Sequence, residues 1–267
     1  MPGSLYTAVS GLQQFQQLID VIGNNIANVN TTAYKNARAT SADAFSQTLG
    51  NAIQVGRGVT SGSVNSDFTP GTLKTGGPND LAIEGQGFFT VKDATTGAIY
   101  ATRDGSFERT IDGFLVTSNG FRLQGFSDAG LTTRGDLKID ATGAAAGARV
   151  VSYAIDAQGK ISAVLDDGTT IFPRGQVLLQ NFASPQALLK AGNNLYSNLA
   201  AAGPLALTLA PGAAGLGSIK AGALEMSNVD LAGEFADLIL AQRGFQANSR
   251  VITTSDELMQ EIISLKR

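Results

Sequence analysis

The sequence lacks three residue types on which much protein chemistry depends. Its 267 residues include no cysteine, no histidine and no tryptophan. Without cysteine there are no disulfides and no thiolate nucleophiles, and without cysteine and histidine nearly every zinc or haem site is closed off. Without histidine there is also no imidazole base that titrates near neutral pH. The composition therefore predicts no cofactor and no metal, and it excludes most catalytic chemistry.

Clustered positive charge and long apolar runs are absent too. The formal net charge is −3 and the pI is about 5.0, with Lys and Arg scattered singly, so no basic stripe is available to neutralise nucleic-acid phosphates. No apolar stretch approaches the roughly 20 residues that cross a bilayer. The first ten residues have neither the basic start nor the apolar run of a secretory signal peptide. We expect no nucleic-acid partner, no membrane insertion and, for any role outside the cytoplasm, export without a cleaved signal peptide.

What the sequence does have is a seven-residue apolar repeat at each end. In the first thirty residues an apolar side chain recurs every seven positions, with a second series three places later, at Leu5, Leu12, Ile19 and Ile26 and at Ala8, Phe15, Ile22 and Val29. The last forty residues repeat the pattern at Leu231, Leu238, Phe245, Ile252 and Met259. This spacing is typical of coiled-coil helices. It predicts helices from Leu5, after an N-cap at Ser4, to about Asn28, and from Leu231 to about Leu265.

These two stripes are the candidate functional surface. A single apolar stripe more often packs inside its own chain, but two stripes at the two termini favour packing between copies, because chain ends usually fray unless something holds them. The predicted assembly interface consists of Leu5, Leu12, Phe15, Ile19, Ile22, Ile26, Leu231, Leu238, Phe245, Ile252 and Met259.

Between the helices the pattern is that of β-structure. Helical periodicity fades over residues 31–78, which are expected to form an extended arm or linker with some strand character. Residues 79–226 are expected to form a mainly antiparallel β domain. Short β-forming runs are separated by Asp104-Gly105, Asp112-Gly113 and Asn119-Gly120, which indicate successive hairpins. The small-residue segment 199–222 is expected to be a flexible loop. The fold class is therefore α+β, with residues 1–30 and 227–267 as one discontinuous helical layer and the β domain inserted between them.

Two local motifs could be interpreted as catalytic or cofactor-binding, but the residue preferences of turns explain them better. Gly85-Gln86-Gly87 precedes a strand, whereas a dinucleotide-binding loop opens a helix. Asp104 with Glu108, and Asp166 with Asp167, could serve as the carboxylate pair of a glycan hydrolase. Each pair lies in or beside a Gly-containing turn, where Asp bonds to its own backbone. A hydrolase and a secreted β-rich adhesin stay as alternative classes; substitution of these acids tests the first, and surface binding by the central segment alone tests the second.

Several longer stretches resemble the signatures of the bacterial flagellar rod and hook proteins. Both ends carry them, and the interior carries three more, at residues 8–12 (AVSGL), 20–35 (DVIGNNIANVNTTAYK), 225–231 (EMSNVDL), 241–248 (AQRGFQAN), 80–89 (DLAIEGQGFF), 102–107 (TRDGSF) and 192–196 (GNNLY). The resemblance covers most of the chain. It implies a structural subunit, not an enzyme, whose terminal helices pack into concentric tubes as a helical homopolymer around an export channel.

The same resemblance implies partners and a location. Subunits of this family travel unfolded through the flagellar type III export apparatus, and the expected neighbours are adjacent rod proteins, the hook cap and the hook–filament junction proteins. The expected location is the hook and basal body, where the polymer transmits motor torque to the filament. Within the family, the short arm from 45 to 72 and residues 177–196 look like the hook branch, which is favoured here. The chain length looks like the distal-rod branch, which is the alternative.

Overall fold

The computed structural model describes residues 2–44, 46–48, 54–128, 130–140, 149–166, 168, 170–171, 175–213 and 215–265. It consists of two compact units. The helical unit comprises Met1–Val29, Lys35–Asp67 and Val229–Arg267, and the β unit comprises Asn30–Tyr34 and Phe68–Asn228. Helices at the two ends of the chain and an antiparallel β-rich domain inserted between them in sequence confirm the expected α+β class. Neither helix within the described ranges is long and apolar enough to span a membrane.

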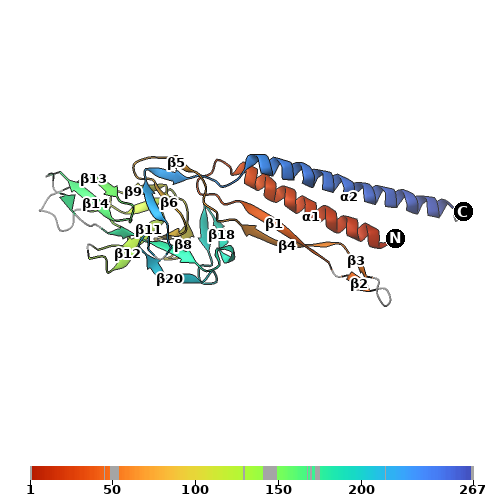
Figure 1. Cartoon of the computed structure of the whole chain (residues 1–267), viewed down its shortest axis with the longest axis horizontal. Helices are drawn as coiled ribbons and strands as arrows, with labels where there is room; N and C mark the ends of the chain where they lie inside the picture. Colours follow the sequence, from red (N-terminus) through yellow and green to blue (C-terminus); the bar gives the residue numbers. More distant parts are fainter. Residues whose placement is uncertain are drawn as a thin grey trace. The chain divides into compact units, whose positions relative to one another are not determined.

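The helical unit contains the two long helices and two short antiparallel strand pairs. Its elements are α1 (Pro2–Ala27), α2 (Leu231–Leu265), β1 (Ala37–Asp43) paired with β4 (Val59–Ser66), and β2 (Ser46–Thr48) paired with β3 (Gln54–Gly56). In Figure 1, α1 and α2 run side by side, with β1 and β4 along α1. Much of the arm predicted over residues 31–78 therefore belongs to this unit.

Both helices begin where local chemistry favours a start. α1 begins at Pro2, before the expected Leu5, because the fixed φ of proline suits the first helical turn and its missing N–H is not needed there. α2 spans Leu231–Leu265, as the repeat predicts. Asp230 caps it: Asp230 Oδ1 accepts a hydrogen bond from the backbone N–H of Ala232 at 3.1 Å.

The β unit is built of antiparallel strands. They are β5 (Leu73–Thr75), β6 (Leu81–Glu84), β7 (Phe88–Lys92), β8 (Ile99–Thr102), β9 (Phe107–Arg109), β10 (Leu115–Thr117), β11 (Arg122–Phe126), β12 (Arg134–Asp136), β13 (Val150–Ile155), β14 (Ile161–Leu165), β15 (Thr170–Ile171), β16 (Gln176–Val177), β17 (Leu179–Phe182), β18 (Leu189–Gly192), β19 (Leu195–Ser197), β20 (Pro204–Leu209), β21 (Ser218–Ala221) and β22 (Ala223–Glu225), with a 3₁₀ turn at Pro185–Ala187. The main sheet has the order β18-β19-β8-β7-β11-β10-β9, and smaller sheets pair β13-β14-β15, β21-β6 and β22-β5.

Strand β7 separates two apolar clusters. Because side chains alternate along a strand, Phe89 and Val91 join the larger cluster while Phe88 joins the smaller one. Phe89 packs edge-to-face on Phe107 at a centroid distance of 5.3 Å. Phe88 makes edge-to-face contacts with three rings, those of Phe68, Phe182 and Tyr196. The β unit therefore has a packed interior on both faces of its central strand.

Two of the three predicted hairpin turns are hairpins in the structure. Gly113 turns β9 into β10 and Gly120 turns β10 into β11, both with positive φ, which glycine adopts without strain. The prediction at Asp104-Gly105 is wrong, because β8 and β9 do not pair and lie far apart in the sheet order. Gly105 serves a close approach instead: its C=O accepts from Leu81 N at 3.0 Å, and a Cβ at Gly105 would overlap the Leu81 carbonyl.

The prediction of a flexible loop over residues 199–222 is also wrong. It contains β20, which pairs with β17, and β21, which pairs with β6. Its small residues give no periodic signal, but pairing with strands already in place supplies the order that local sequence does not.

Candidate assembly interface

The two helices of the helical unit pack antiparallel. Gly11 near the start of α1 lies against Asn248 in the second half of α2, where a Cβ at Gly11 would stand 2.8 Å from Asn248 Nδ2. Phe15 lies against Gly244, and Asn25 near the end of α1 contacts Glu234 near the start of α2. The partner numbers fall along α2 as they rise along α1. The two terminal helices therefore pack against each other within one chain.

Small residues at the contact let the two helices approach closely. A Cβ added to Gly244 would overlap the ring of Phe15, and Ala8 and Ala241 are buried at 3% and 1% exposure. The sequence analysis missed this feature because a glycine inside a helix lowers helix stability by about 1 kcal/mol relative to alanine. It was therefore not expected to contribute to the contact. The signal was available: an isolated glycine in a strong helical pattern usually has a packing reason.

A buried polar cluster joins both helices to β1. The Glu234 carboxylate accepts from Asn25 Nδ2 at 3.2 Å and from Asn36 Nδ2 at 3.0 Å. Asn25 Nδ2 also donates to Asn36 Oδ1 at 2.7 Å, and Asn25 Oδ1 accepts from the backbone N–H of Ala37 at 3.0 Å. Asn25 is 1% exposed and Glu234 9%. Because a buried carboxylate is costly unless its hydrogen bonds are made, this cluster specifies how α1, α2 and β1 fit together.

The predicted interface residues fall into three classes of exposure. One is buried, Ile22, at 3%. Partly buried are Leu5, Leu12, Phe15, Ile19, Ile26, Leu238, Phe245 and Ile252, and exposed are Leu231 and Met259. Most of them are therefore covered in part by the rest of the helical unit and retain some exposed surface. Their role in contacts between copies, and a coiled-coil geometry, stay predictions.

A second apolar stripe runs along α2 outside the predicted one. Val251, Leu258 and Leu265 are spaced by seven residues, and Leu240 and Ile262 lie on the same side of the helix. Their exposed fractions are 43%, 52%, 86%, 67% and 47% in that order. Sequence reasoning followed only the stripe through Phe245. An exposed row of large apolar side chains on a helix marks an interaction surface.

The end of α2 extends past its partner. α2 has 35 residues and α1 has 26, and the Gly11–Asn248 contact sets a register that leaves the last turns of α2 beyond the start of α1 (Figure 1). Leu258, Met259, Ile262, Ile263 and Leu265 in these turns are all exposed. In water such an end gains little from helix formation alone, so it is stabilised by neighbours or frays.

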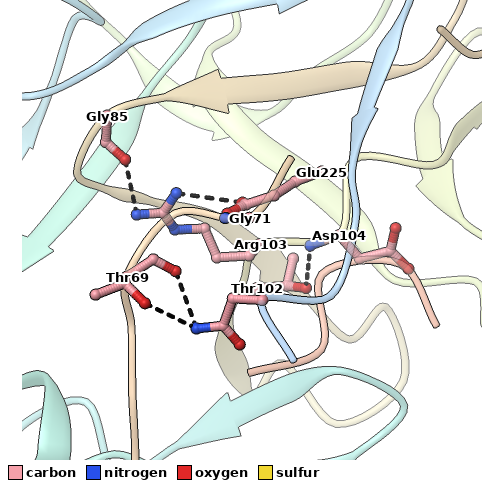
Figure 2. Close-up of polar contacts among 8 residues, drawn as sticks. Thr69, Gly71, Gly85, Thr102, Arg103, Asp104 and Glu225 are labelled. Atoms are coloured by element: carbon pink, nitrogen blue, oxygen red, sulfur yellow. Dashed lines mark hydrogen bonds and ion pairs between the residues drawn. The ribbon is translucent and has the colours of Figure 1, made fainter. Parts of the chain in front are cut away.

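Among its described residues, the β unit contains a fully buried ion pair, which Figure 2 shows. Arg103 Nη1 lies 3.2 Å from Glu225 Oε2, and both side chains are at most 2% exposed. Arg103 Nη2 donates to the carbonyl of Gly85 at 2.9 Å, and Glu225 Oε1 accepts from Gly71 N–H at 2.9 Å. Burial lowers the pKa of Arg103, and the charge of Glu225 partly opposes that shift.

This pair ties together segments that are distant in sequence. Ala33 N–H donates to the carbonyl of Glu225 at 2.8 Å, and Asn228 Nδ2 donates to Thr69 Oγ1 at 2.9 Å (Figure 2 shows Thr69). The segments around Ala33, Thr69 and Asn228 are those through which the chain enters and leaves the β unit. These hydrogen bonds and the ion pair join the entering and leaving segments within the β unit. The Gly85-Gln86-Gly87 motif lies in a turn between β6 and β7, and its Gly85 carbonyl accepts one of the hydrogen bonds of Arg103.

The acidic pairs considered for a hydrolase lie in turns and edges. Asp104 Oδ1 accepts from Ser106 N–H at 3.2 Å, and Asp166 Oδ1 accepts from Arg149 N–H at 3.2 Å, both of them backbone-bracing contacts. Burial raises the pKa of Asp104, while Glu108 is exposed. Asp167 lies outside the described residues. Within the described ranges, nothing places two of these carboxylates across a cleft.

Family models match three parts of the chain. They are described as flagella basal body rod protein over residues 5–35, flagellar hook protein FlgE/F/G D1 domain over residues 82–163, and flagellar basal body rod FlgEFG protein C-terminal over residues 220–265. The first match covers most of α1, the last contains α2, and the middle one lies in the β unit.

Full-length relatives agree with these models. The chain is 41% identical over 277 positions to the flagellar basal-body rod protein FlgG of Bacillus subtilis, with 99% of each chain covered. It is 34% identical over 277 positions to FlgG of Agrobacterium fabrum, with 98% of each covered. It is 25% identical to the flagellar hook protein FlgE of Borreliella burgdorferi, over 445 positions that cover all of both chains.

Proposed function

Because the chain belongs to the family of bacterial flagellar rod and hook proteins, we propose that it is the distal-rod subunit of the flagellar basal body. Members of this family are structural subunits of the flagellum. In the proposed role many copies polymerise through their terminal helices into a tubular shaft that carries motor torque outward.

The observation that carries the proposal is the apolar surface left on the helix pair. α1 and α2 already bury their common face, yet Phe235, Ile239, Leu240, Leu258 and Ile263 remain at least half exposed. Burying apolar surface gains about 25 cal/mol per Å², so these side chains favour packing against further helices. A tube of such pairs supplies that packing on several sides at once.

Length favours the distal rod over the hook, which sequence reasoning placed first. The rod relatives align with this chain almost end to end, over 277 positions at up to 41% identity. The hook relative needs 445 positions to align with these 267 residues, so a large part of it has no counterpart here. The features interpreted as hook-like, the short arm and residues 177–196, lie in a chain that the alignments to both kinds of relative cover almost completely.

The structure of a single copy suits a torque-bearing part. The helix pair is locked by the Asn25–Asn36–Glu234 cluster, and the β unit by the Arg103–Glu225 pair. Hydrogen-bonded charged groups inside a structure resist sliding, because any displacement leaves a buried charge unpaired. The proposed neighbours are more copies of the chain and the rod and hook proteins above and below it. Export through the flagellar type III apparatus is part of the same proposal.

Deletion of the gene and electron microscopy of the remaining basal bodies test the assignment. A distal-rod subunit is needed before the hook, so its loss is expected to leave a shortened rod without a hook. Complementation with the intact gene restores both. A complete rod that lacks only the hook assigns the chain to the hook branch instead, and unchanged hook–basal bodies contradict both roles.

A further inference from the structure

The turn between β9 and β10 presents an isoleucine that the fold does not use. Ile111 is fully exposed, at 105% of its reference area. Turn positions favour Gly, Pro, Asn, Asp and Ser, and an apolar branched side chain there contributes nothing to folding. We call Thr110 to Gly113 the Ile111 turn.

The Ile111 turn is held rigidly. Gly113 N–H donates to the carbonyl of Thr110 at 2.9 Å, and Thr110 N–H donates to the carbonyl of Phe114 at 2.9 Å. Ile139 N–H donates to the carbonyl of Gly113 at 2.7 Å, which fixes the turn to the body of the β unit. A pre-formed tip loses little entropy when it binds, so Ile111 is presented as a ready contact.

The same unit contains a pocket that no side chain of the described chain fills. It has a volume of about 230 Å³ and is lined by Thr90 on β7, Ile99 on β8, Gln124 on β11, Arg134 on β12 and Leu178 beside β17. A dry apolar cavity of about 150 Å³ accepts a benzene-sized ligand. The Thr90 pocket, as we call it, is therefore large enough for a branched four-carbon side chain.

One residue that lines this pocket has an enclosed hydroxyl without a hydrogen-bond partner. Thr90 is 8% exposed, and its hydroxyl makes no hydrogen bond within the described residues. An unsatisfied buried hydroxyl is costly, and such groups are usually matched by a ligand or water. The Thr90 oxygen is closed off from solvent, so it lies beneath the pocket surface and is not a contact for an incoming turn.

Charge on the turn and on the pocket is complementary. Asp112, next to Ile111, is exposed, and Arg134 is the one charged residue among the described lining residues, with its side chain at the exposed rim. The attraction between Asp112 and Arg134 favours one orientation of the turn in the pocket and disfavours the opposite orientation.

We propose that the Ile111 turn of one copy inserts into the Thr90 pocket of another. Ile111 fills the space between Ile99 and Leu178, and Asp112 faces Arg134. The two surfaces differ, so the contact is heterologous and can be repeated from one copy to the next along a helical polymer. The inference rests on the proposed function only in that the occupant is a second copy, and it adds a contact between β units to the contacts of the helices.

The cysteine-free sequence allows a clean cross-linking test. A chain with Asp112→Cys and Arg134→Cys is concentrated in purified form, and is also expressed in place of the native gene, followed by isolation of basal bodies. Mild oxidation is expected to give a ladder of linked chains. Asn119→Cys with Arg134→Cys is the control, because Asn119 lies at an exposed hairpin tip that carries no apolar side chain. Docking raises the effective concentration of the matched pair, so about tenfold more product than the control is expected.

Substitutions give a second readout. Ile111→Asp is expected to reduce linking of the matched cysteines to the control level, while circular dichroism stays unchanged because Ile111 touches nothing in the monomer. Asp112→Arg weakens self-association of the otherwise native chain, measured by sedimentation, and Asp112→Arg with Arg134→Asp restores it. Equal ladders from matched and control pairs, or normal self-association of Ile111→Asp, overturn the proposal.

The two proposals fail in different ways. If the chain is absent from rods but the matched cysteines link in concentrated solution, the docking contact stands and the distal-rod assignment falls. If rods are complete and contain the chain but the matched pair does not link, the rod assignment stands and the docking contact falls.

Discussion

The β unit and the helical unit differ in how completely they bury their large apolar side chains. In the β unit, Phe88, Phe89 and Phe107 are at most 2% exposed, and strands on several sides cover them. In the helical unit, Phe15 and Phe245 are only partly buried, and the C-terminal turns of α2 expose large apolar side chains throughout. A region that completes its own core is stable alone, whereas a region that leaves apolar surface uncovered is stabilised by neighbours. The difference separates what folds each copy from what joins the copies.

The largest expected effect comes from a charge in the helix seam. Ile19→Asp places a carboxylate among partly buried apolar side chains, where an unpaired charge is strongly unfavourable, so assembly is expected to be lost completely. The β unit contains none of these contacts and keeps its fold. Electron microscopy of basal bodies and circular dichroism of the purified protein measure the two results, with Ile19→Leu as the conservative control. Normal assembly of Ile19→Asp would show that the helix seam is not part of the assembly interface.

In the dilute monomer, amide hydrogens of the helical unit should exchange orders of magnitude faster than those of the β unit. Amides in residues 80–125 are expected to exchange only through global opening of the β unit, while those in residues 5–28 and 231–263 exchange through local fraying. Limited proteolysis should trim both chain ends first. Equal protection of helices and strands in the monomer would show that the helix pair is stable without neighbours.

A matched pair of phenylalanine truncations sharpens the contrast. Phe89→Ala, at a position with 0% exposure, is expected to destabilise the monomer by about 3–5 kcal/mol. Phe245→Ala removes a ring that is only partly buried, so its cost in the monomer stays below about 3 kcal/mol and the larger loss appears in the polymer. Urea unfolding of the monomer and counting of assembled rods provide the two measurements. A cost for Phe245→Ala in the monomer as large as that for Phe89→Ala argues against the division of roles.

The buried ion pair gives a comparable but local effect. Glu225→Gln leaves Arg103 buried without its carboxylate and should destabilise the β unit by about 3–5 kcal/mol in urea unfolding. The control is Asp136→Asn, which breaks the partly exposed pair of Asp136 with Arg122 and should cost about 1 kcal/mol or less. Replacing Arg103 and Glu225 together by methionine should recover part of the loss, but not all, because Gly71 and Gly85 lose their partners. Similar costs for the two single variants would contradict a special role for the buried pair.

Prediction from sequence succeeded where the signal is local and failed where partners are distant. The seven-residue repeat predicted both helices, and β-forming runs such as Phe88-Phe89-Thr90-Val91 predicted the central strands. The Asn25–Glu234 contact joins residues 209 positions apart, and no local pattern announces it. Strands β20 and β21 escaped prediction because their order comes from pairing with β17 and β6. The apolar stripe through Val251 was present in the sequence but was overlooked beside the stronger stripe through Phe245.

The smallest expected effect is a dependence of stability on pH through Asp104. Burial raises the pKa of this carboxyl above its ordinary 3.8, against opposing hydrogen bonds from Ser106 and Thr32. The native state therefore binds the proton more tightly than the unfolded state. The stability that Asp104 contributes is fully present below pH 3.8, falls as the pH rises to the raised native pKa, and is constant above it.

Asp104→Asn isolates this effect, because the amide oxygen can still accept from Ser106 N–H but carries no charge at any pH. Measured by urea unfolding between about pH 3 and pH 7, wild type should lose stability relative to Asp104→Asn as the pH rises through that window, and the gap should then stay level. Other carboxylates titrate in both proteins and cancel in the difference. Parallel stability curves for the two proteins would show that Asp104 is solvated in the native state, and that even the turn leading out of β8 belongs to the surface instead of the closed interior of the β unit.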